Sequence, residues 1–380
     1  MSDNNKIKPF IKWAGGKEKE LKYIKDCLPD KINRYIEPFV GGGAVYFDMN
    51  ISNSYINDKS TELMNLYGCI KNNNTEFLND LSNINQSWKK IEKFLEKNSN
   101  ELLGLRKEYS NIMKENMNNS KRIKDSIEGF IKNYTYELIE IVPKTIDIAK
   151  ENFIKEISRN LYSKITRMYK IELKKGELSK KDEIDNLECA LKSAFYMHLR
   201  YIYNNAEKLK VEMPLYTAIF YFIREYCYAS MFRYNSNGKF NVPYGGISYN
   251  RKYLTKKIEY ISSDKVKKYM LNTSLHTDDF EVFMNKFEFS KDDFIFLDPP
   301  YDTEFSTYAQ NEFDKEDQIR LANYMKNTKA KFMLIIKNTD FIYNLYNIEK
   351  FKIRSFDKKY MVSFQNRNDK NVEHLIITNY

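Results

Sequence analysis

Residues 33–58, NRYIEPFVGGGAVYFDMNISNSYIND, decide the fold class of this chain. Tyr35–Ile36 predicts a short strand, and Glu37–Gly43 is a loop with three consecutive glycines. A helix is expected to begin at Ala44–Phe47, and Ser54–Ile56 predicts a second strand that ends at Asn57-Asp58. This order of strand, glycine-rich loop, helix and strand is typical of the start of a nucleotide-binding α/β unit.

Strands are predicted again near the end of the chain. Phe294–Leu297 is a continuous apolar run that ends at Asp298-Pro299-Pro300-Tyr301, and Lys331–Ile336 and Glu373–Tyr380 are two more such runs. Runs of this length are typical of strands that are buried on both faces. We therefore expect one Rossmann-like α/β domain whose two parts are separated by other sequence.

The sequence between these parts has a helical pattern. Residues 72–213 are rich in Lys, Glu and Asn, with apolar residues at helical spacing, and residues 217–232 predict a buried helix. The stripes are Trp88, Ile91, Phe94 and Leu95, and Ile146, Ala149, Phe153, Ile157, Leu161, Ile165 and Met168. We expect a catalytic domain of residues 1–71 and 253–380, and a helical insertion with target-recognition function at 72–252.

Composition limits the classes of protein. The chain has 380 residues, 42% hydrophobic and 30% charged, which is typical of a folded protein. No apolar run approaches the roughly 18–20 residues that cross a bilayer, and MSDNNKIKPF has no apolar stretch of a secretory signal. The four cysteines form no CxxC pair, and with three histidines they give no zinc-ligand spacing, so we expect no metal and a reducing cytoplasm.

The charge balance favours a polyanionic partner. Lys and Arg total 62 against 52 Asp and Glu, a net charge of +10. A basic protein attracts nucleic acid first. However, a chain crowded with Lys, Asn, Ile, Tyr and Phe is also what an AT-rich genome produces, so charge alone leaves the question open.

Asp298-Pro299-Pro300-Tyr301 is the strongest chemical signal. Ligand chemistry in open α/β sheets lies at the carboxyl ends of strands. Two prolines remove two N–H donors, which leaves a carboxylate, free carbonyl oxygens and an aromatic ring. Such a site suits a flat group that carries an amine, such as an exposed nucleobase, although a tight turn is the alternative.

The glycine loop predicts a nucleoside site. Glu37-Pro38-Phe39-Val40-Gly41-Gly42-Gly43 allows a ligand to approach the backbone, but it is neither GxGxxG nor a Walker loop, so a phosphate site is disfavoured. Asp58, at the end of the next strand, is placed to accept hydrogen bonds from ribose hydroxyls.

Two further segments are unusual. Lys12-Trp13-Ala14-Gly15-Gly16-Lys17 puts a Trp between two lysines beside a Gly pair, unless it is only an arm folded over the core. RYNSNGKFNVPYG, residues 233–245, mixes Arg, Asn and Lys with aromatics, which can contact base edges and stack on bases. A solvated basic surface is the alternative.

Together these segments resemble the Dam-like, or D12, class of DNA adenine-N6 methyltransferases. KWAGGK, EPFVGGGAV, INDKSTELMNLY, RYNSNGKFNVPYG and DPPY occur in that family's order, and residues 362–380 resemble its C-terminus. The resemblance covers about residues 6–70 and 217–380 and leaves 72–213 unmatched. One departure is Lys337-Asn338-Thr339-Asp340, where relatives often carry Ser before Asn.

The resemblance implies a Rossmann-like, S-adenosylmethionine-dependent sheet and roles for particular residues. Asp298, Pro299, Pro300 and Tyr301 would be catalytic, with Asp298 and the Pro299 carbonyl accepting from the target amine and Tyr301 stacking on a flipped adenine. Asp298 would also lie at the cofactor site. The other implied cofactor-binding residues are Trp13, Ala14, Gly15, Lys17, Glu37, Pro38, Phe39, Gly41, Gly43, Ala44, Asp58, Asp279 and Phe280. The expected DNA-binding residues are Lys12, Arg233, Tyr234, Asn235, Asn237, Lys239, Asn241, Tyr244 and Arg251.

The implied activity is methyl transfer to adenine N6 in duplex DNA, with GATC as the favoured site. Adenine methylation in RNA, amino methylation of cytosine, and a non-catalytic DNA-binding protein of the same fold are the alternatives. The resemblance also implies a cytoplasmic, nucleoid-associated protein of bacterial or phage origin. A cognate restriction endonuclease is a further candidate partner. The sequence does not decide whether such a partner exists, nor whether the protein is a monomer or a dimer.

Overall fold

The computed structural model describes residues 7–114, 120–300, 313–359 and 371–380. The chain divides into two compact units. The sheet unit consists of Met1–Asn72 and Ser263–Tyr380, and the helical unit is Asn73–Ser262. The helical unit thus includes the residues from 253 to Ser262 as well.

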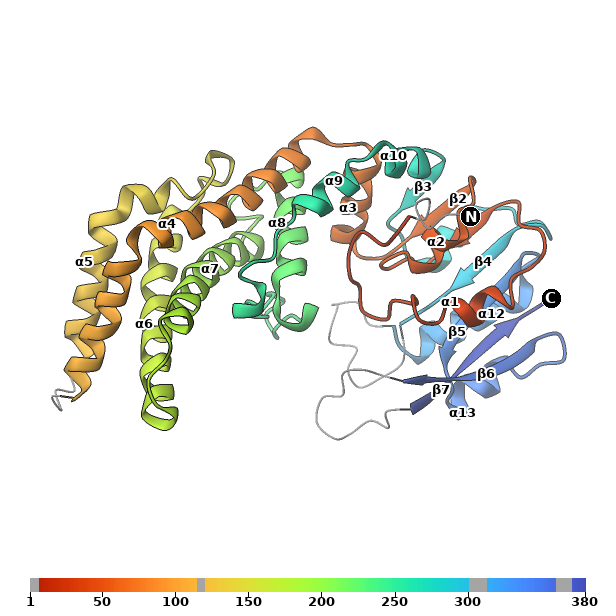
Figure 1. Cartoon of the computed structure of the whole chain (residues 1–380). Coiled ribbons are helices and arrows are strands. Elements are labelled where there is room, and N and C mark those ends of the chain that lie inside the picture. The colour runs from red at the N-terminus through yellow and green to blue at the C-terminus, as the bar shows by residue number, and fades with distance from the viewer. Residues whose placement is uncertain (1–6, 115–119, 301–312, 360–370) are drawn as a thin grey trace. The chain divides into compact units, whose positions relative to one another are not determined.

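The sheet unit contains a seven-stranded sheet of order β3-β2-β1-β4-β5-β7-β6 (Figure 1). The strands from β3 to β5 in this order are parallel, and β7 runs antiparallel to both β5 and β6. The strand bounds are β1 Tyr35–Glu37, β2 Ser54–Asn57, β3 Thr273–His276, β4 Phe294–Leu297, β5 Lys331–Lys337, β6 Lys352–Lys359 and β7 Asn371–Thr378.

Sequence patterns predict five of these strands and miss β3 and β6. β3 is TSLH and has no apolar run, and β6 is KIRSFDKK, a charged strand at the edge of the sheet. Edge strands often carry lysines, which discourage pairing with other chains. Such a strand has no apolar run by which the sequence would reveal it. The closing apolar run is antiparallel rather than one of the parallel strands.

The helices α11, α12 and α13 cover one face of this sheet. Their apolar residues form a single core cluster with alternate residues of the strands. Ile295 and Leu297 of β4 lie in that cluster, and Leu321 of α12 and Tyr346 of α13 pack against it. Phe294 of β4 contacts the ring of Tyr35 on the opposite face, as strand alternation requires. The helices of the sheet unit are α1 Leu21–Lys25, α2 Ala44–Met49, α3 Thr61–Lys71, α10 Asp264–Met270, α11 Phe280–Met284, α12 Lys315–Asn327 and α13 Asp340–Tyr346.

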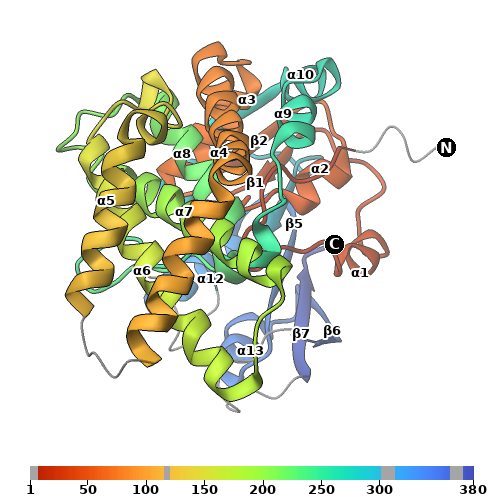
Figure 2. The ribbon, with the colours of Figure 1, turned by 60° about the vertical axis from the view of Figure 1, so that its left-hand side comes forward.

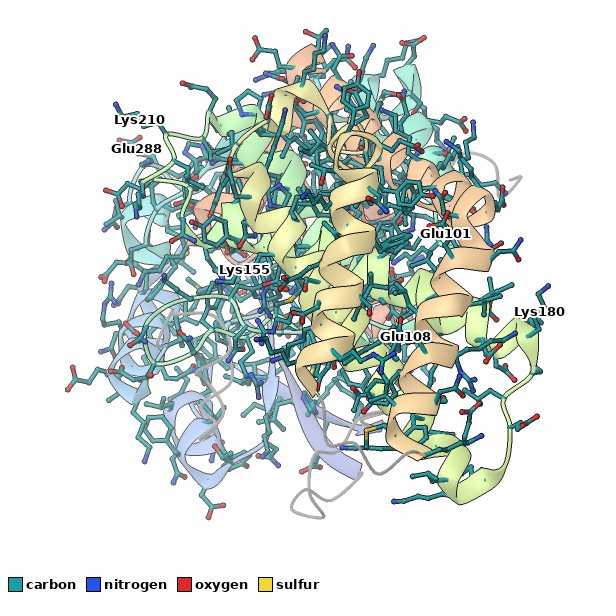
Figure 3. The ribbon with its side chains drawn as sticks, turned by 90° about the vertical axis from the view of Figure 1, so that its left-hand side faces the viewer. Glu101, Glu108, Lys155, Lys180, Lys210 and Glu288 are labelled. Carbon is teal, nitrogen blue, oxygen red and sulfur yellow. The ribbon has the colours of Figure 1, made fainter. Side chains whose placement is uncertain are left out.

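The helical unit contains long helices that pack side by side (Figure 2). Glu101 and Glu108, labelled in Figure 3, lie on α4 and accept hydrogen bonds from Tyr134 and Ser126 of α5, so these two helices run antiparallel. The helices are α4 Thr75–Lys114, α5 Ser120–Ile139, α6 Lys150–Lys175, α7 Lys180–Asn204, α8 Met213–Tyr226 and α9 Thr255–Ile261. Short 3-10 turns are Lys144–Ile146, Tyr228–Ser230 and Ile247–Tyr249.

The helical stripe from Ile146 to Met168 is only partly one helix. Phe153, Ile157, Leu161, Ile165 and Met168 are buried on α6, but that helix begins at Lys150. Ile146 belongs to the preceding 3-10 turn, and Ala149 adopts a left-handed conformation with φ of 55° at the start of α6. Apolar spacing continues across this break, since both segments bury their apolar side chains.

Among the described residues, none of the helices has both the length and the apolar character that crossing a membrane requires. Within the same ranges, His, Cys, Asp and Glu form no group of three or more that could hold a metal ion.

Candidate active site

The order of the parallel strands places a topological switch point at the carboxyl ends of β1 and β4, and we call this place the crevice. The chain runs from β1 outward to β2 on one side, and from β4 outward to β5 on the other, so the direction of winding reverses between β1 and β4. Open α/β sheets bind ligands at this reversal. The glycine loop follows β1 and Asp298 follows β4, so both lie at the crevice.

An ion pair joins the N-terminal segment to this crevice. Lys17 Nζ lies 2.5 Å from Asp298 Oδ2 and 2.9 Å from the carbonyl oxygen of Gly15. The Lys17 side chain is 2% exposed and that of Asp298 is 18% exposed. Lys17 thus holds KWAGGK against the Asp-Pro-Pro segment, 281 residues later in the sequence.

The same N-terminal segment packs against the glycine loop. Gly41 and Gly43 have φ of 49° and 75°, in the left-handed region that favours glycine. A Cβ atom at Gly41 would lie 2.9 Å from Trp13 Cδ1, and one at Gly43 would lie 2.6 Å from the Tyr67 hydroxyl. The glycines therefore permit both the turn and the close approach of Trp13. Pro38 and Ala44, which flank the loop, are buried, while Ala14 is exposed.

Asp58 holds the glycine loop to the end of β2. Its Oδ2 accepts a hydrogen bond from the Gly41 N–H at 3.0 Å, and its Oδ1 accepts one from the Ser60 N–H at 2.9 Å. Burial raises the pKa of Asp58 to about 6, and nearby Glu62 adds to the rise, while the two N–H donors oppose it. A carboxylate in this position can still accept hydrogen bonds with its remaining lone pairs.

The family resemblance implies that Asp58 binds the cofactor, and with that role its shifted pKa predicts a pH dependence of cofactor binding. Because the native pKa lies above the ordinary value, Asp58 gains a proton as the pH falls through about 6 and becomes a weaker acceptor. We expect S-adenosylmethionine to bind about tenfold more weakly at pH 5 than at pH 7 if the ionised form is the one that binds. Calorimetry at both pH values measures this, and Asp58→Asn should remove the inflection near pH 6. An inflection that persists in Asp58→Asn would assign it to another group.

Glu37 is a buried carboxyl group at the end of β1. Its Oε2 accepts a hydrogen bond from the Tyr35 hydroxyl at 2.8 Å. Burial raises the pKa of Glu37 well above its ordinary value, and the charges of Asp298 and Asp58 raise it further. The carboxyl groups at the ends of β2 and β4 therefore interact electrostatically with Glu37 at the end of β1.

Aromatic rings line the other side of the glycine loop. The Phe39 ring centroid lies 5.6 Å from that of Phe280 and 5.5 Å from that of Phe313. Asp279 caps the N-terminus of α11 through a hydrogen bond from the Glu281 N–H. The structure thus brings Asp279 and Phe280 to the loop that carries Phe39, although HTDDF is a weak motif in the sequence.

Three residues that support this site are not predicted from the sequence. Asn57 donates to the carbonyl oxygens of Pro38 and Asp278, each at 3.0 Å. Arg320 pairs with Asp279 at 2.7 Å, and Gln318 donates to the carbonyl oxygen of Pro300 at 3.2 Å. Arg320 and Gln318 come from a stretch without a motif. Asn57 belongs to the INDKSTELMNLY segment, but its bond to Asp278 spans 221 residues, so no local signal identifies this role. Tyr301, the last residue of DPPY, lies outside the described residues, whereas Pro299 is buried.

The expected DNA-contacting loop lies in the helical unit and starts with a hairpin. Tyr234 pairs with Phe240, and the Asn235 N–H donates to the Lys239 carbonyl oxygen at 2.9 Å. Asn235 Oδ1 accepts the N–H groups of Asn237 and Lys239, each at 3.0 Å, so Asn235 shapes the turn. Of the expected DNA-binding residues, those exposed at this tip are Arg233, Asn235, Asn237 and Lys239.

Several other expected DNA contacts have partners within the helical unit. Tyr244 is 7% exposed and donates to Asn250 Oδ1, and the Tyr234 hydroxyl bonds that of Tyr203. Asn241 accepts from Arg233 at 3.3 Å. Arg251 pairs with Glu92 and Glu188 at 2.9 and 3.0 Å. Lys12, by contrast, belongs to the sheet unit and is exposed.

The fold and the crevice define a class of protein. A mixed sheet with parallel central strands, a glycine loop after β1 and acidic groups at the ends of β1, β2 and β4 is consistent with the fold of S-adenosylmethionine-dependent methyltransferases. The chain belongs to the D12 class N6 adenine-specific DNA methyltransferases, whose family profile matches residues 13–141 and 110–362. It is thus an adenine-specific DNA methyltransferase, and membership implies S-adenosylmethionine as cofactor and DNA as substrate.

Named relatives align over nearly the whole chain, and the family profile includes residues 72–213, which the sequence motifs leave unmatched. Type II methyltransferase M.CviBI of Paramecium bursaria Chlorella virus NC1A is 26% identical over 98% of this chain and 100% of its own length. Type II methyltransferase M.MjaIII of Methanocaldococcus jannaschii is 26% identical over 98% of this chain and 99% of its own. The DNA adenine methylase of Haemophilus influenzae is 24% identical over 91% of this chain and 85% of its own.

Proposed function

We propose that this protein transfers a methyl group to the N6 amine of an adenine that leaves the duplex, at the crevice between β1 and β4. The ion pair between Lys17 and Asp298 carries the proposal, since it links the two segments that contribute the cofactor site and the acceptor site. It also holds Asp298 as a partly exposed acceptor at the strand end.

The residues around the glycine loop fit S-adenosylmethionine, which supplies an electrophilic methyl group. Asp58 offers an acceptor to ribose hydroxyls, and Phe39 and Phe280 offer aromatic surface to adenine. Trp13, Ala14, Gly15 and Lys17 form the segment that would hold the methionine part. The remaining cofactor assignments, Glu37, Pro38, Gly41, Gly43, Ala44, Asp279 and Asp298, flank these groups along the same strand ends.

The chain's own residues would make the target amine a better nucleophile. The lone pair of adenine N6 is conjugated with the ring, so the amine is planar and weakly reactive. Asp298 and the Pro299 carbonyl would accept its two hydrogens, which favours a pyramidal nitrogen and stabilises its developing positive charge. Pro300 fixes the backbone, with its carbonyl held by Gln318. Tyr301 would stack on the extruded base.

We assign the helical unit to target recognition and residues 233–251 to DNA contact. Extruding the base costs a few kcal/mol, and base contacts and stacking offset this cost. Exposed Arg233 and Lys239 suit phosphate or guanine contacts, and Asn237 suits adenine. Lys12 would add a phosphate contact from the sheet unit. GATC is the proposed recognition sequence.

Removing the charges of the hairpin tip tests this assignment. We expect Arg233→Ala and Lys239→Ala each to raise the KM for duplex DNA, because each removes a contact to the polyanion. Each should also reduce the slope of log binding constant against log salt by about 1 if it contacts a phosphate. Lys181→Ala is the matched control, because Lys181 is an exposed α7 lysine that pairs with Asp185 on the same helix. Unchanged KM and salt slope in both variants would contradict the role of this segment.

Two measurements test the activity itself. Incubation with methyl-labelled S-adenosylmethionine should label duplex DNA and should not label RNA. Single-molecule sequencing of DNA from cells that express the protein should then place N6-methyladenine at one short motif, with GATC as the expected result. A different motif would reject GATC while leaving the chemistry intact, whereas label in RNA alone would contradict the proposed substrate.

A further inference from the structure

Residues 233–251, here called the recognition segment, have little regular structure of their own. Isolated bridges join Tyr234 to Phe240 and Cys227 to Tyr244, and a 3-10 turn occupies Ile247–Tyr249. Backbone N–H and C=O groups that are not in a ladder still need partners when they are shielded from water. The helical unit supplies many of these partners from one helix.

α7 carries polar side chains at every fourth position from Glu188 to Asn204, a row that is inclined to the helix axis, and each contacts the recognition segment. Residues four apart share a face of an α-helix. The first of these side chains along α7 contacts Arg251 and the last contacts Phe240, so the recognition segment lies antiparallel to α7. We call this set the α7 polar stripe: Glu188, Lys192, Tyr196, Arg200 and Asn204.

The C-terminal end of the stripe holds the hairpin directly. The Asn204 side chain donates to the Phe240 carbonyl oxygen at 2.9 Å and accepts from the Phe240 N–H at 2.8 Å. A single amide thus replaces a strand partner for both backbone groups of Phe240. Phe240 itself is 1% exposed, so these backbone groups lie beside a packed ring.

The middle and the N-terminal end of the stripe contact the part of the recognition segment that follows the hairpin, from Val242 to Arg251. Tyr196 and Arg200 both donate to the Val242 carbonyl oxygen, at 3.0 and 3.1 Å. Lys192 donates to the Asn250 carbonyl oxygen, and Glu188 pairs with Arg251 at 3.0 Å. The contacts reach backbone or charged groups along the segment between Phe240 and Arg251.

We propose that the α7 polar stripe is a set of positioning residues that orders the recognition segment before DNA arrives, and so sets the affinity and sequence selectivity of methylation. The inference rests on the proposed role of the recognition segment in DNA binding. Preorganisation lowers the cost of ordering a loop on binding, so a stripe that holds the hairpin strengthens specific binding without touching a base.

Asn204→Ala is the principal test, with Asn186→Ala as a matched control. Asn186 also lies on α7, but its side chain donates to a carbonyl oxygen of the same helix, that of Asp182. If the ordered hairpin falls to about a tenth of the population, the KM for the specific duplex rises about tenfold. We expect faster amide hydrogen exchange across residues 234–242, that rise in KM, and a kcat and KM for S-adenosylmethionine close to wild type.

A milder pair of variants guards against misfolding. Tyr196→Phe removes only the hydroxyl that donates to Val242, and Tyr201→Phe makes the same change on an exposed α7 residue. Tyr196→Phe should shift exchange and KM in the same direction as Asn204→Ala, and less, because Arg200 still donates to Val242. Tyr201→Phe should match wild type.

The specific duplex in these measurements carries the recognition site found by sequencing. Each duplex of a second set differs from it by one base pair within that site. Greater loss on the specific duplex than on the changed duplexes supports the inference. Unchanged exchange in Asn204→Ala, or faster exchange with unchanged KM, overturns it. If Arg233→Ala and Lys239→Ala also leave KM unchanged, the proposed DNA role of the segment fails. If those two raise KM and Asn204→Ala does not, only the inference fails.

Discussion

Asp298→Asn should lower kcat for DNA methylation by about 10²–10³-fold, the loss that accompanies removal of one preorganised polar group at developing charge. The amide is close in size to the carboxylate, so the shape of the strand end is kept. It carries no charge, however, and cannot pair with the buried Lys17 ammonium as Asp298 does at 2.5 Å. The weaker acceptor stabilises the developing positive charge of the amine less.

Single-turnover kinetics with labelled cofactor measures this effect, and binding of cofactor is measured separately, since Asp298 also lies at the proposed cofactor site. Asp292→Asn is the matched control. Asp292 precedes β4 rather than following it, and its ion pair with Lys31 is long, at 3.6 Å, and largely exposed. A rate for Asp298→Asn within threefold of the control would exclude Asp298 as an acceptor for the target amine.

Lys192→Met should reduce the free energy of unfolding by about 3–5 kcal/mol, the cost of removing one partner from a buried ion pair. Lys192 and Glu188 are both fully buried and lie 2.8 Å apart, and Lys192 also pairs with Glu92. Without Lys192, two carboxylates would share Arg251, whose side chain is 56% exposed. The ammonium also lies 4.8 Å from the centre of the Trp88 ring, so a cation–π contact is lost as well.

Urea unfolding of the full chain, followed by circular dichroism, measures the change. Lys181→Met is the control, because Lys181 is exposed and its pair with Asp185 should contribute no more than about 0.5 kcal/mol. Adding Glu188→Gln to Lys192→Met should recover about 1–3 kcal/mol through coupling of the two charges. A loss equal to that of the control would mean that Lys192 is not held in a buried pair.

Local patterns in the sequence identify the elements that begin and end at the crevice. Tyr35–Glu37, Ser54–Asn57 and Phe294–Leu297 are short strands with an apolar centre, followed by Pro38, Asp58 and Asp298, and the structure has all three as parallel neighbours. Burial on both faces selects such apolar runs, so the signal is strong. β3 and β6 lack it, because TSLH and KIRSFDKK lie on the two edges of the sheet.

The sequence by itself determined the family, the parallel core and the motifs that surround the crevice, because each is encoded within a few adjacent residues. Only the tertiary structure decided which distant groups meet. It pairs Lys17 with Asp298 and Arg320 with Asp279, and it lines the recognition segment with α7. Such contacts depend on strand order and helix packing across more than thirty residues of sequence, and no local pattern records them.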